Sequence, residues 1–354
     1  MSPGGEDGEF GALRALSARI GADPRLVQAA GGNTSLKHEG LLWVKASGTW
    51  LAQAETRAIL VPVRLGPLRA ALAAGDTAAE SALGFVDPAR NPEGLRPSIE
   101  TALHAALPHR VVVHVHCVDT IAHAIEVGAE ARLAPLLAGL SWRFIPYARP
   151  GVPLAAAIGG GSVRYGAAAD VLVLGNHGLV VGGETVAAAE ALLRDVCRRL
   201  ARPARVAAAA EEEARLARLA EGTGWRVAPA AVHGTATDPA ALAVARRGSL
   251  YPDHVIYLGP GVLVVEAGES LGAALALRQA AGGPEPPLAL VPGAGALMSA
   301  SASAGEVALA QCLADVTLRV PEGARVSVLG PAAEAELLGW DAEAYRRALE
   351  RKLP

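Results

Sequence analysis

Hydrophobic residues recur along the first half of this chain with two different periods, and turn residues mark the places where one period replaces the other. Apolar positions at helical spacing predict a helix from Phe10 to Ile20. A break at Gly31-Gly32-Asn33 precedes two short strands, at 34–37 and 41–45, which a hairpin-like turn joins. Further helices are predicted at 68–74, 77–83, 99–107, 120–127, 130–137 and 184–200, and further strands at 110–116, 142–145, 171–174 and 179–181. Strands with intervening helices predict an α/β sandwich.

The second half of the chain predicts a smaller unit. A strongly helical pattern covers 207–221, and the segment 222–239 then loses periodicity and gains Gly, Pro and Thr. Strand-like runs follow at 255–258, 262–265, 288–291 and 326–329, with helices at 306–319 and 342–351. We therefore predict a flexible N-terminus (1–9), a main domain (10–220), a linker (221–240) and a small α/β domain (241–354) whose role stays open.

Three helix starts carry a capping signal. Ser98 is expected to cap the helix at 99–107, and Thr77 and Glu80 have the spacing of a capping box. Asp119 is expected to cap the helix that begins at Thr120. Each side chain would satisfy backbone N–H groups that a first helical turn leaves without partners.

Composition and charge exclude two classes of function. Of the 354 residues, 51% are hydrophobic, which is enough apolar material for two folded domains. A formal net charge of −3, without a dominating stripe of Lys or Arg, argues against electrostatic binding of nucleic acid. No apolar run reaches membrane-spanning length, the first ten residues lack the pattern of a signal peptide, and the three cysteines are widely spaced. A cytoplasmic protein without nucleic-acid or membrane partners is expected.

Three histidines at strand ends predict a metal site. His114 and His116 follow a β-branched run, and alternate residues of a strand face the same side, so both imidazoles are expected to point into one space. Such a pair alone is more typical of packing at a strand end. However, His177 follows the buried run 171–174, and Glu100 lies at a helix start. Three imidazoles and one carboxylate predict a catalytic centre for one divalent ion, zinc by preference, with an open position.

Glu100 is the candidate for proton transfer at this centre. A bound ion would chelate a vicinal carbonyl and hydroxyl and withdraw charge from a developing enediolate, and that step needs a base aimed at the substrate C–H. The apolar neighbours Ile99 and Leu103 favour the partial desolvation that keeps a carboxylate basic beside a cation. Alone, Glu100 would be interpreted as a first-turn carboxylate favoured by the helix dipole. His104 is expected to lie outside the ligand set or in the core.

Several short polar side chains suit an anion. Asn33, Ser47 and Ser98 each lie beside accessible backbone N–H groups, although each alone is more typical of a turn or a cap. The glycines at 293–295 do not continue as a dinucleotide-binding loop, and so no nucleotide is predicted.

Five ordered motifs resemble the class II aldolase/adducin superfamily, over roughly residues 10–205. They are Gly32-Asn33-Thr34-Ser35, Ala46-Ser47-Gly48-Thr49, Pro97-Ser98-Ile99-Glu100, His114-Val115-His116 and Asn176-His177-Gly178. The segments at 42–48 and 251–256 most closely resemble the aldolase half of bifunctional rhamnulose phosphate aldolase/lactaldehyde dehydrogenases. No dehydrogenase domain is expected in these 354 residues.

This resemblance implies a fold, a reaction and an anion site. The fold is a class II aldolase-like α/β/α sandwich with a central mixed, mainly antiparallel sheet, formed by the domain at 10–220. The reaction is that of a fuculose/rhamnulose phosphate aldolase-like lyase of carbohydrate metabolism, which cleaves a ketose phosphate or related hydroxy-keto sugar through a metal-stabilised enediolate. The matched positions that hold the substrate phosphate are Asn33, Ser47, Gly48 and Ser98. Ile99 stands where some family aldolases have a second serine, which removes one hydroxyl donor. A homo-oligomer is implied, with a tetramer favoured.

Other functions remain open at this point. A sugar-phosphate 4-epimerase and an oxo-acid phosphate decarboxylase of the same superfamily would use the same centre. A non-catalytic, adducin-like interaction module would need none of the four residues Glu100, His114, His116 and His177, and their joint presence argues against it.

Overall fold

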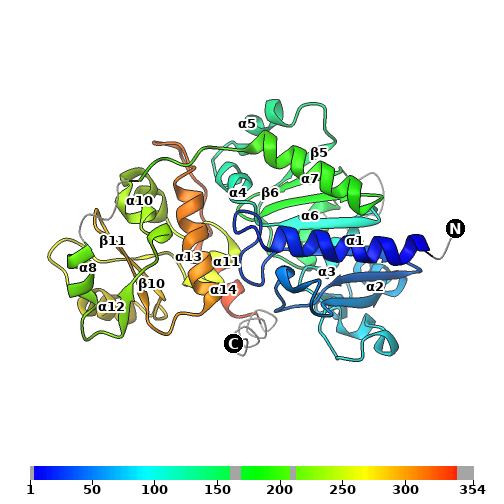
Figure 1. Cartoon of the computed structure of the whole chain (residues 1–354), viewed down its shortest axis with the longest axis horizontal. Coiled ribbons are helices and arrows are strands. Elements are labelled where there is room, and N and C mark those ends of the chain that lie inside the picture. The colour runs from blue at the N-terminus through cyan, green and yellow to red at the C-terminus, as the bar shows by residue number, and fades with distance from the viewer. Residues whose placement is uncertain (1–3, 160–168, 208–212, 341–354) are drawn as a thin grey trace.

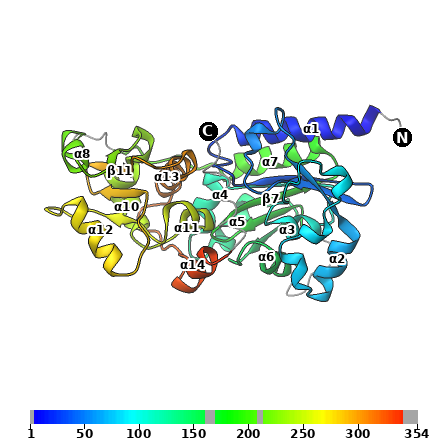
Figure 2. The ribbon, with the colours of Figure 1, turned by 90° about the horizontal axis from the view of Figure 1, so that it is seen from below.

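The computed structural model describes residues 4–159, 169–207 and 213–340. Figure 1 shows two units side by side, each with its own sheet, and Figure 2 shows the same division after a quarter turn. Within the described ranges, no helix combines the length and the apolar character that crossing a bilayer requires.

The first unit contains a seven-stranded sheet with the order β3-β2-β1-β4-β7-β6-β5. All neighbouring strands are antiparallel except β5 and β6, and so the predicted mixed, mainly antiparallel sheet is confirmed. The strands are β1 (Asn33–His38), β2 (Leu41–Lys45), β3 (Leu60–Arg64), β4 (Val111–Val115), β5 (Trp142–Ile145), β6 (Val171–Leu174) and β7 (Gly178–Gly183).

Helices cover both faces of this sheet, which gives the predicted α/β/α sandwich (Figure 1). They are α1 (Gly4–Gly21), α2 (Leu65–Ala74), α3 (Thr101–Ala106), α4 (Val118–Ala124), α5 (Ala129–Leu136), α6 (Val152–Ile158) and α7 (Val186–Leu200). Short 3-10 helices are η1 (Leu51–Gln53), η2 (Thr77–Glu80), η3 (Leu83–Phe85) and η4 (Pro88–Arg90).

The central strand β4 contributes side chains to both layers. Val111, Val113 and Val115 belong to the apolar cluster that includes residues of α1 and α7. Val112 belongs instead to the cluster that includes residues of α3 and α6. Because strand residues alternate between faces, His114 points to the same side as Val112, toward α3. The apolar pattern of the strand thus fixes the direction of its polar end.

The second unit is built on a four-stranded sheet with the order β8-β11-β10-β9. Its strands are β8 (Trp225–Val227), β9 (Leu263–Val264), β10 (Leu288–Val291) and β11 (Gly295–Ser299). Its helices are α8 (Glu213–Ala220), η5 (Ala230–Val232), α9 (Gly234–Thr237), α10 (Pro239–Ala245), α11 (Pro252–Leu258), α12 (Leu271–Ala280), α13 (Ala304–Thr317) and α14 (Pro331–Leu338). In both views α11 and α13 lie where the two units meet.

The contact between the units is a continuous apolar core. Val118 and Ile121 of α4 share one buried cluster with Val255 of α11 and with Leu309 and Leu313 of α13. Each such side chain contributes about 1.5–3 kcal/mol when fully buried, whereas an exposed ion pair contributes about 0–1 kcal/mol. Apolar burial therefore dominates the docking of the second unit.

Two strand predictions in the second unit are wrong. Residues 255–258 belong to α11, which begins with Pro252 at its first turn and is buried at all seven positions. A helix that is buried on all sides has no periodic polar face. Its sequence is therefore a continuous apolar run, which is also typical of a buried strand. Residues 326–329 form only isolated bridges, from Val326 to Glu126 and from Leu329 to Ser249.

Two short strands, β8 and β11, were not expected. β8 and α9 fall in the segment 221–240, which was predicted to be a linker, and β8 pairs with β11. We propose that the boundary between the units lies earlier, in the connection 201–207 after α7. The helix predicted at 342–351 lies outside the described residues.

Several helix starts differ from the predicted ones. Asp76, not Thr77, caps η2 through the N–H of Ala78. α3 begins at Thr101, later than expected, and its N-cap position is Glu100. α4 begins before Asp119, whose carboxylate accepts hydrogen bonds from Arg319 and from the backbone of Arg202 instead. α1 begins at Gly4, so part of the segment expected to be flexible is helical.

Candidate metal centre

Strand β4 and the residue that follows it place two of the predicted ligands, His114 and His116, close together. His114 pairs in register with Asn33 of β1 and with Val180 of β7, and it is fully buried. His116 follows directly after the strand and is 6% exposed. The two ring centroids lie 5.0 Å apart. The expected convergence of both imidazoles is therefore present.

The third histidine comes from the turn between β6 and β7. Asn176 in this turn has a left-handed φ of 52°, a conformation that asparagine tolerates better than most residues. At Gly178 an added Cβ would lie 2.5 Å from the carbonyl oxygen of Val115, so only glycine allows β7 to approach β4 this closely. The ring of His177 consequently lies 4.9 Å from that of His114 and 5.3 Å from that of His116.

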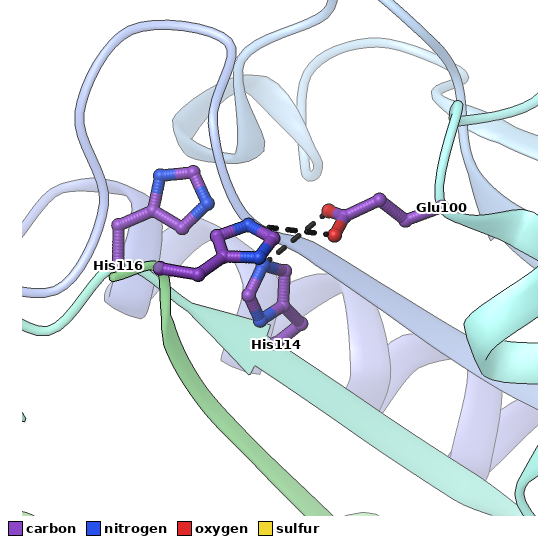
Figure 3. Close-up of side chains that lie close together, drawn as sticks. Glu100, His114 and His116 are labelled. Carbon is purple, nitrogen blue, oxygen red and sulfur yellow. Dashed lines mark ion pairs between the residues drawn. The ribbon is translucent and has the colours of Figure 1, made fainter. Parts of the chain in front are cut away.

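Glu100 reaches the three histidines from the start of α3. Its Oε2 lies 3.3 Å from Nε2 of His114, and its Oε1 lies 3.5 Å from Nε2 of His177. Figure 3 shows the carboxylate of Glu100 pointing toward the histidine rings, with dashed lines for these two ion pairs. Asn33 donates a hydrogen bond of 2.8 Å to Oε2 and so fixes the orientation of the carboxylate.

This cluster fits a divalent metal ion. The four residues Glu100, His114, His116 and His177 each offer one ligand atom, and these atoms lie within 4.8 Å of one another. Ligand atoms around a tetrahedral zinc with bonds of about 2.0–2.1 Å lie roughly 3.3 Å apart, close to the shortest separations here.

Unsatisfied buried atoms support the same conclusion. Within the described part of the chain, Nε2 of His114, Nε2 of His116 and Oε1 of Glu100 are buried without a hydrogen-bond partner. Buried polar atoms nearly always have partners, and an ion would supply one here.

The electrostatics suit a metal-binding site. Burial alone would raise the pKa of Glu100, but the three histidines beside it and the hydrogen bond from Asn33 outweigh burial and lower it to about 2. Burial lowers the pKa of His177 to about 3, and it lowers the pKa of His114 as well. An ionised carboxylate and neutral imidazoles are the protonation states in which these groups bind metal.

Asn33 links the cluster to an outer network. Its Nδ2 also donates to Oγ of Ser98 at 3.2 Å, and its Oδ1 contacts Nε2 of His104. Nδ1 of His104 lies 2.7 Å from Oγ of Ser35. His104 thus orients Asn33, and it is outside the ligand cluster, as expected.

The residues predicted to bind phosphate lie on three segments. Asn33 and Ser98 both belong to the network around Glu100, and Ser98 Oγ also accepts the N–H of Glu100. Ser47 and Gly48 follow Ala46, which bridges to Pro97 just before Ser98. However, the amides of Ser47 and Ser98 already donate to backbone carbonyls, so an anion here would depend mainly on side chains.

One residue near the site was not predicted. Oδ2 of Asp253, from α11 of the second unit, lies 3.1 Å from Nδ1 of His116. Asp253 lies in the segment 251–256 that carried part of the resemblance, but that resemblance did not reveal a contact across two units.

Comparison with known proteins identifies the family. Residues 13–201 match the model of the class II aldolase and adducin N-terminal domain. This range covers more than half of the chain, which therefore belongs to the class II aldolase and adducin family.

Individual relatives are similar to about half of the chain. The N-terminal class II aldolase domain of a conserved protein from Thermoplasma acidophilum is 27% identical and covers 53% of this chain and 90% of its own, with a TM-score of 0.45. L-fuculose-1-phosphate aldolase from Thermus thermophilus is 17% identical and covers 54% and 91%, with a TM-score of 0.37. YuxG, an uncharacterized oxidoreductase of Bacillus subtilis (strain 168), is 31% identical over 179 residues, or 47% of this chain. The match spans 25% of YuxG, so this chain corresponds to about a quarter of that curated relative.

Proposed function

We propose that the protein is a metal-dependent aldolase, a carbon–carbon lyase that cleaves a ketose phosphate or a related hydroxy-keto sugar. The observation that carries this proposal is the convergence of Glu100 with His114, His116 and His177 in one buried cluster with unsatisfied ligand atoms. Membership of the class II aldolase and adducin family supports the same reaction class.

The three histidines would hold the ion, and zinc is the favoured metal because neutral imidazole nitrogens suit it. When bound, the ion would act as a Lewis acid toward substrate oxygens on which negative charge develops. Nδ1 of His114 faces the carbonyl oxygen of Leu179 at 3.0 Å, which selects the tautomer with a free lone pair on Nε2.

Glu100 would move the proton at the substrate carbon. The hydrogen bond from Asn33 occupies Oε2, while Oε1 has no hydrogen-bond partner among the described residues. In the condensation direction Oε1 would take a proton from the carbon next to the carbonyl. In the cleavage direction the same oxygen would return a proton to that carbon after the carbon–carbon bond breaks. Proton transfer to Glu100 would depend on a substrate C–H that is acidified next to the carbonyl.

The substrate phosphate would bind at Asn33, Ser47, Gly48 and Ser98. Support comes from the bridge between Ala46 and Pro97, which places Ser47 and Ser98 on adjacent segments of the chain. Gly48 has a left-handed φ of 75°, which turns the chain directly after Ser47.

Removal of the metal should abolish turnover. The purified protein would be stripped with a chelator, reloaded with zinc, and offered ketose phosphates and their unphosphorylated counterparts. We expect a fall on the order of 10²-fold or more without metal, since Lewis-acid stabilisation of charge is worth several kcal/mol. Aldehyde release, measured by nuclear magnetic resonance, would report cleavage.

The same experiment separates the alternatives. An epimer without free aldehyde would identify a 4-epimerase, and carbon dioxide release would identify a decarboxylase. Full turnover after chelation would contradict the proposal, and a protein that binds no metal would point to an interaction module.

We also propose a cytoplasmic homo-oligomer, with a tetramer favoured. The support is family membership. Light scattering at micromolar concentration should give a multiple of the monomer mass. A monomer with full activity would contradict this assembly.

A further inference from the structure

The second unit reaches the metal centre through one carboxylate. Asp253 lies in the first turn of α11 and is 3% exposed, and its Oδ2 is 3.1 Å from Nδ1 of His116. The contact is made on the ring edge away from the unsatisfied Nε2 of His116. Asp253 is outside the group of four ligand residues, so it lies one ring away from the ion they would hold.

The pair between His116 and Asp253 is tightly enclosed. An added Cβ at Gly31 would lie 2.8 Å from Nδ1 of His116 and 2.9 Å from Oδ2 of Asp253. On another side, a Cβ at Gly178 would lie 3.4 Å from Cα of His116. Gln28 donates a hydrogen bond to the carbonyl oxygen of His116 at 3.3 Å. The surrounding backbone therefore leaves the ring and the carboxylate little freedom to rearrange.

A second contact ties the loop of His177 to the same unit. Nδ2 of Asn176, the residue before His177, donates hydrogen bonds of 3.0 Å to the carbonyl oxygens of Leu250 and Ser327. Leu250 lies three residues before Asp253, so both contacts come from neighbouring parts of the second unit. Two of the three histidines are thus positioned by contacts with this unit.

We propose that Asp253 is a positioning residue of the metal centre, and that the C-terminal unit is an integral part of this centre. A neutral imidazole carries one N–H and one lone pair, and an acceptor at Nδ1 places the lone pair on Nε2. Asp253 Oδ2 faces Nδ1 of His116 at 3.1 Å, on the same ring atom that the carbonyl oxygen of Leu179 faces in His114 at 3.0 Å. A carboxylate partner also makes the imidazole a stronger ligand, and loss of such partners typically weakens metal binding by roughly 10–100-fold.

This inference rests on the proposed function, because it requires that the histidines bind a metal. It assigns the C-terminal unit a role that sequence alone left open. In this role the apolar core between α4, α11 and α13 holds Asp253 at the correct distance from β4.

The test compares zinc affinity in three variants, measured by competition with a chromophoric chelator. D253A removes the acceptor, and we expect a loss of zinc affinity of roughly 10–100-fold. D253N keeps an acceptor oxygen but removes the charge, and we expect an intermediate loss. The visible absorption of the cobalt-loaded protein should change in the same order, because the orientation of His116 changes. A purely structural role would not produce this graded spectral change.

Asp119 provides the matched control. Its carboxylate also joins the two units, through a 2.9 Å contact with Nε of Arg319, but it contacts none of the four ligand residues. D119N should lower the thermal midpoint and leave zinc affinity unchanged. Zinc affinity equal to wild type in both Asp253 variants would overturn this inference alone, as would an equal loss in D119N. A wild-type protein that binds no zinc would overturn the proposed function as well.

Discussion

Replacing His177 with alanine will abolish metal binding and activity together. The ring of His177 lies 4.9 Å from that of His114, and its Nε2 lies 3.5 Å from Oε1 of Glu100, so it closes the ligand cluster. Two imidazoles hold a divalent ion poorly, and a small side chain at this position leaves no donor atom. We expect a larger loss of affinity than the change of roughly 10–100-fold for residues that only support a ligand.

The measurement is zinc content after dialysis, beside turnover at saturating zinc. His109 offers a matched control, because it is also buried and next to β4 but bonds to Asp170 at 2.8 Å, outside the cluster. H109A should retain one zinc per chain. A tightly bound zinc in H177A would show that this histidine is not a ligand.

The metal centre was predictable because its geometry is local to single strands. The alternation of β4 decides that His114 and His116 point the same way, and the buried run of β6 decides where His177 emerges. The sequence also placed Glu100 near a helix start, although α3 begins one residue after it. Errors of one or two residues at a helix end did not matter, since Glu100 reaches the rings from the turn before the helix.

The contribution of the second unit was not predictable from local patterns. Asp253 contacts a residue 137 positions earlier in the chain, and nothing in its neighbourhood encodes that contact. The position of Asp253 was also harder to predict because α11 is buried at every position and its apolar sequence is typical of a strand. Gly293 lies in the turn between β10 and β11, and Gly295 begins β11. A strand as short as β8 gives too few alternations for a period to be recognised.

The proposed anion site was less predictable from the sequence than the metal centre, but more predictable than the contact of Asp253. The bridge between Ala46 and Pro97 brings Ser47 and Ser98 onto adjacent segments. These side chains were expected beside accessible backbone N–H groups, but the amides of Ser47 and Ser98 themselves donate to the carbonyl oxygens of Arg96 and Lys45. Sequence patterns identify turn residues, but they do not show which backbone groups a neighbouring segment has already satisfied.

Replacing Glu100 with glutamine will lower turnover by roughly 10²-fold or more while the protein keeps its fold and most of its metal at saturating zinc. Asn33 donates to Oε2, so the amide oxygen of the glutamine would take that position. The amide nitrogen would then lie near the histidine nitrogens, where it fills space but cannot accept a proton. Zinc affinity should fall modestly, because the amide removes the negative charge that attracts the ion.

The decisive measurement for E100Q is the exchange of the substrate C–H with solvent deuterium, followed beside metal content. E126Q is the matched control, since Glu126 is also buried but pairs with Arg202 at 2.6 Å and with Arg132, outside the ligand cluster. E126Q should lower stability and leave exchange unchanged. Exchange at the wild-type rate in E100Q would show that Glu100 is not the base. Loss of metal as complete as in H177A would instead make the carboxylate an essential ligand, and proton transfer would then need another group.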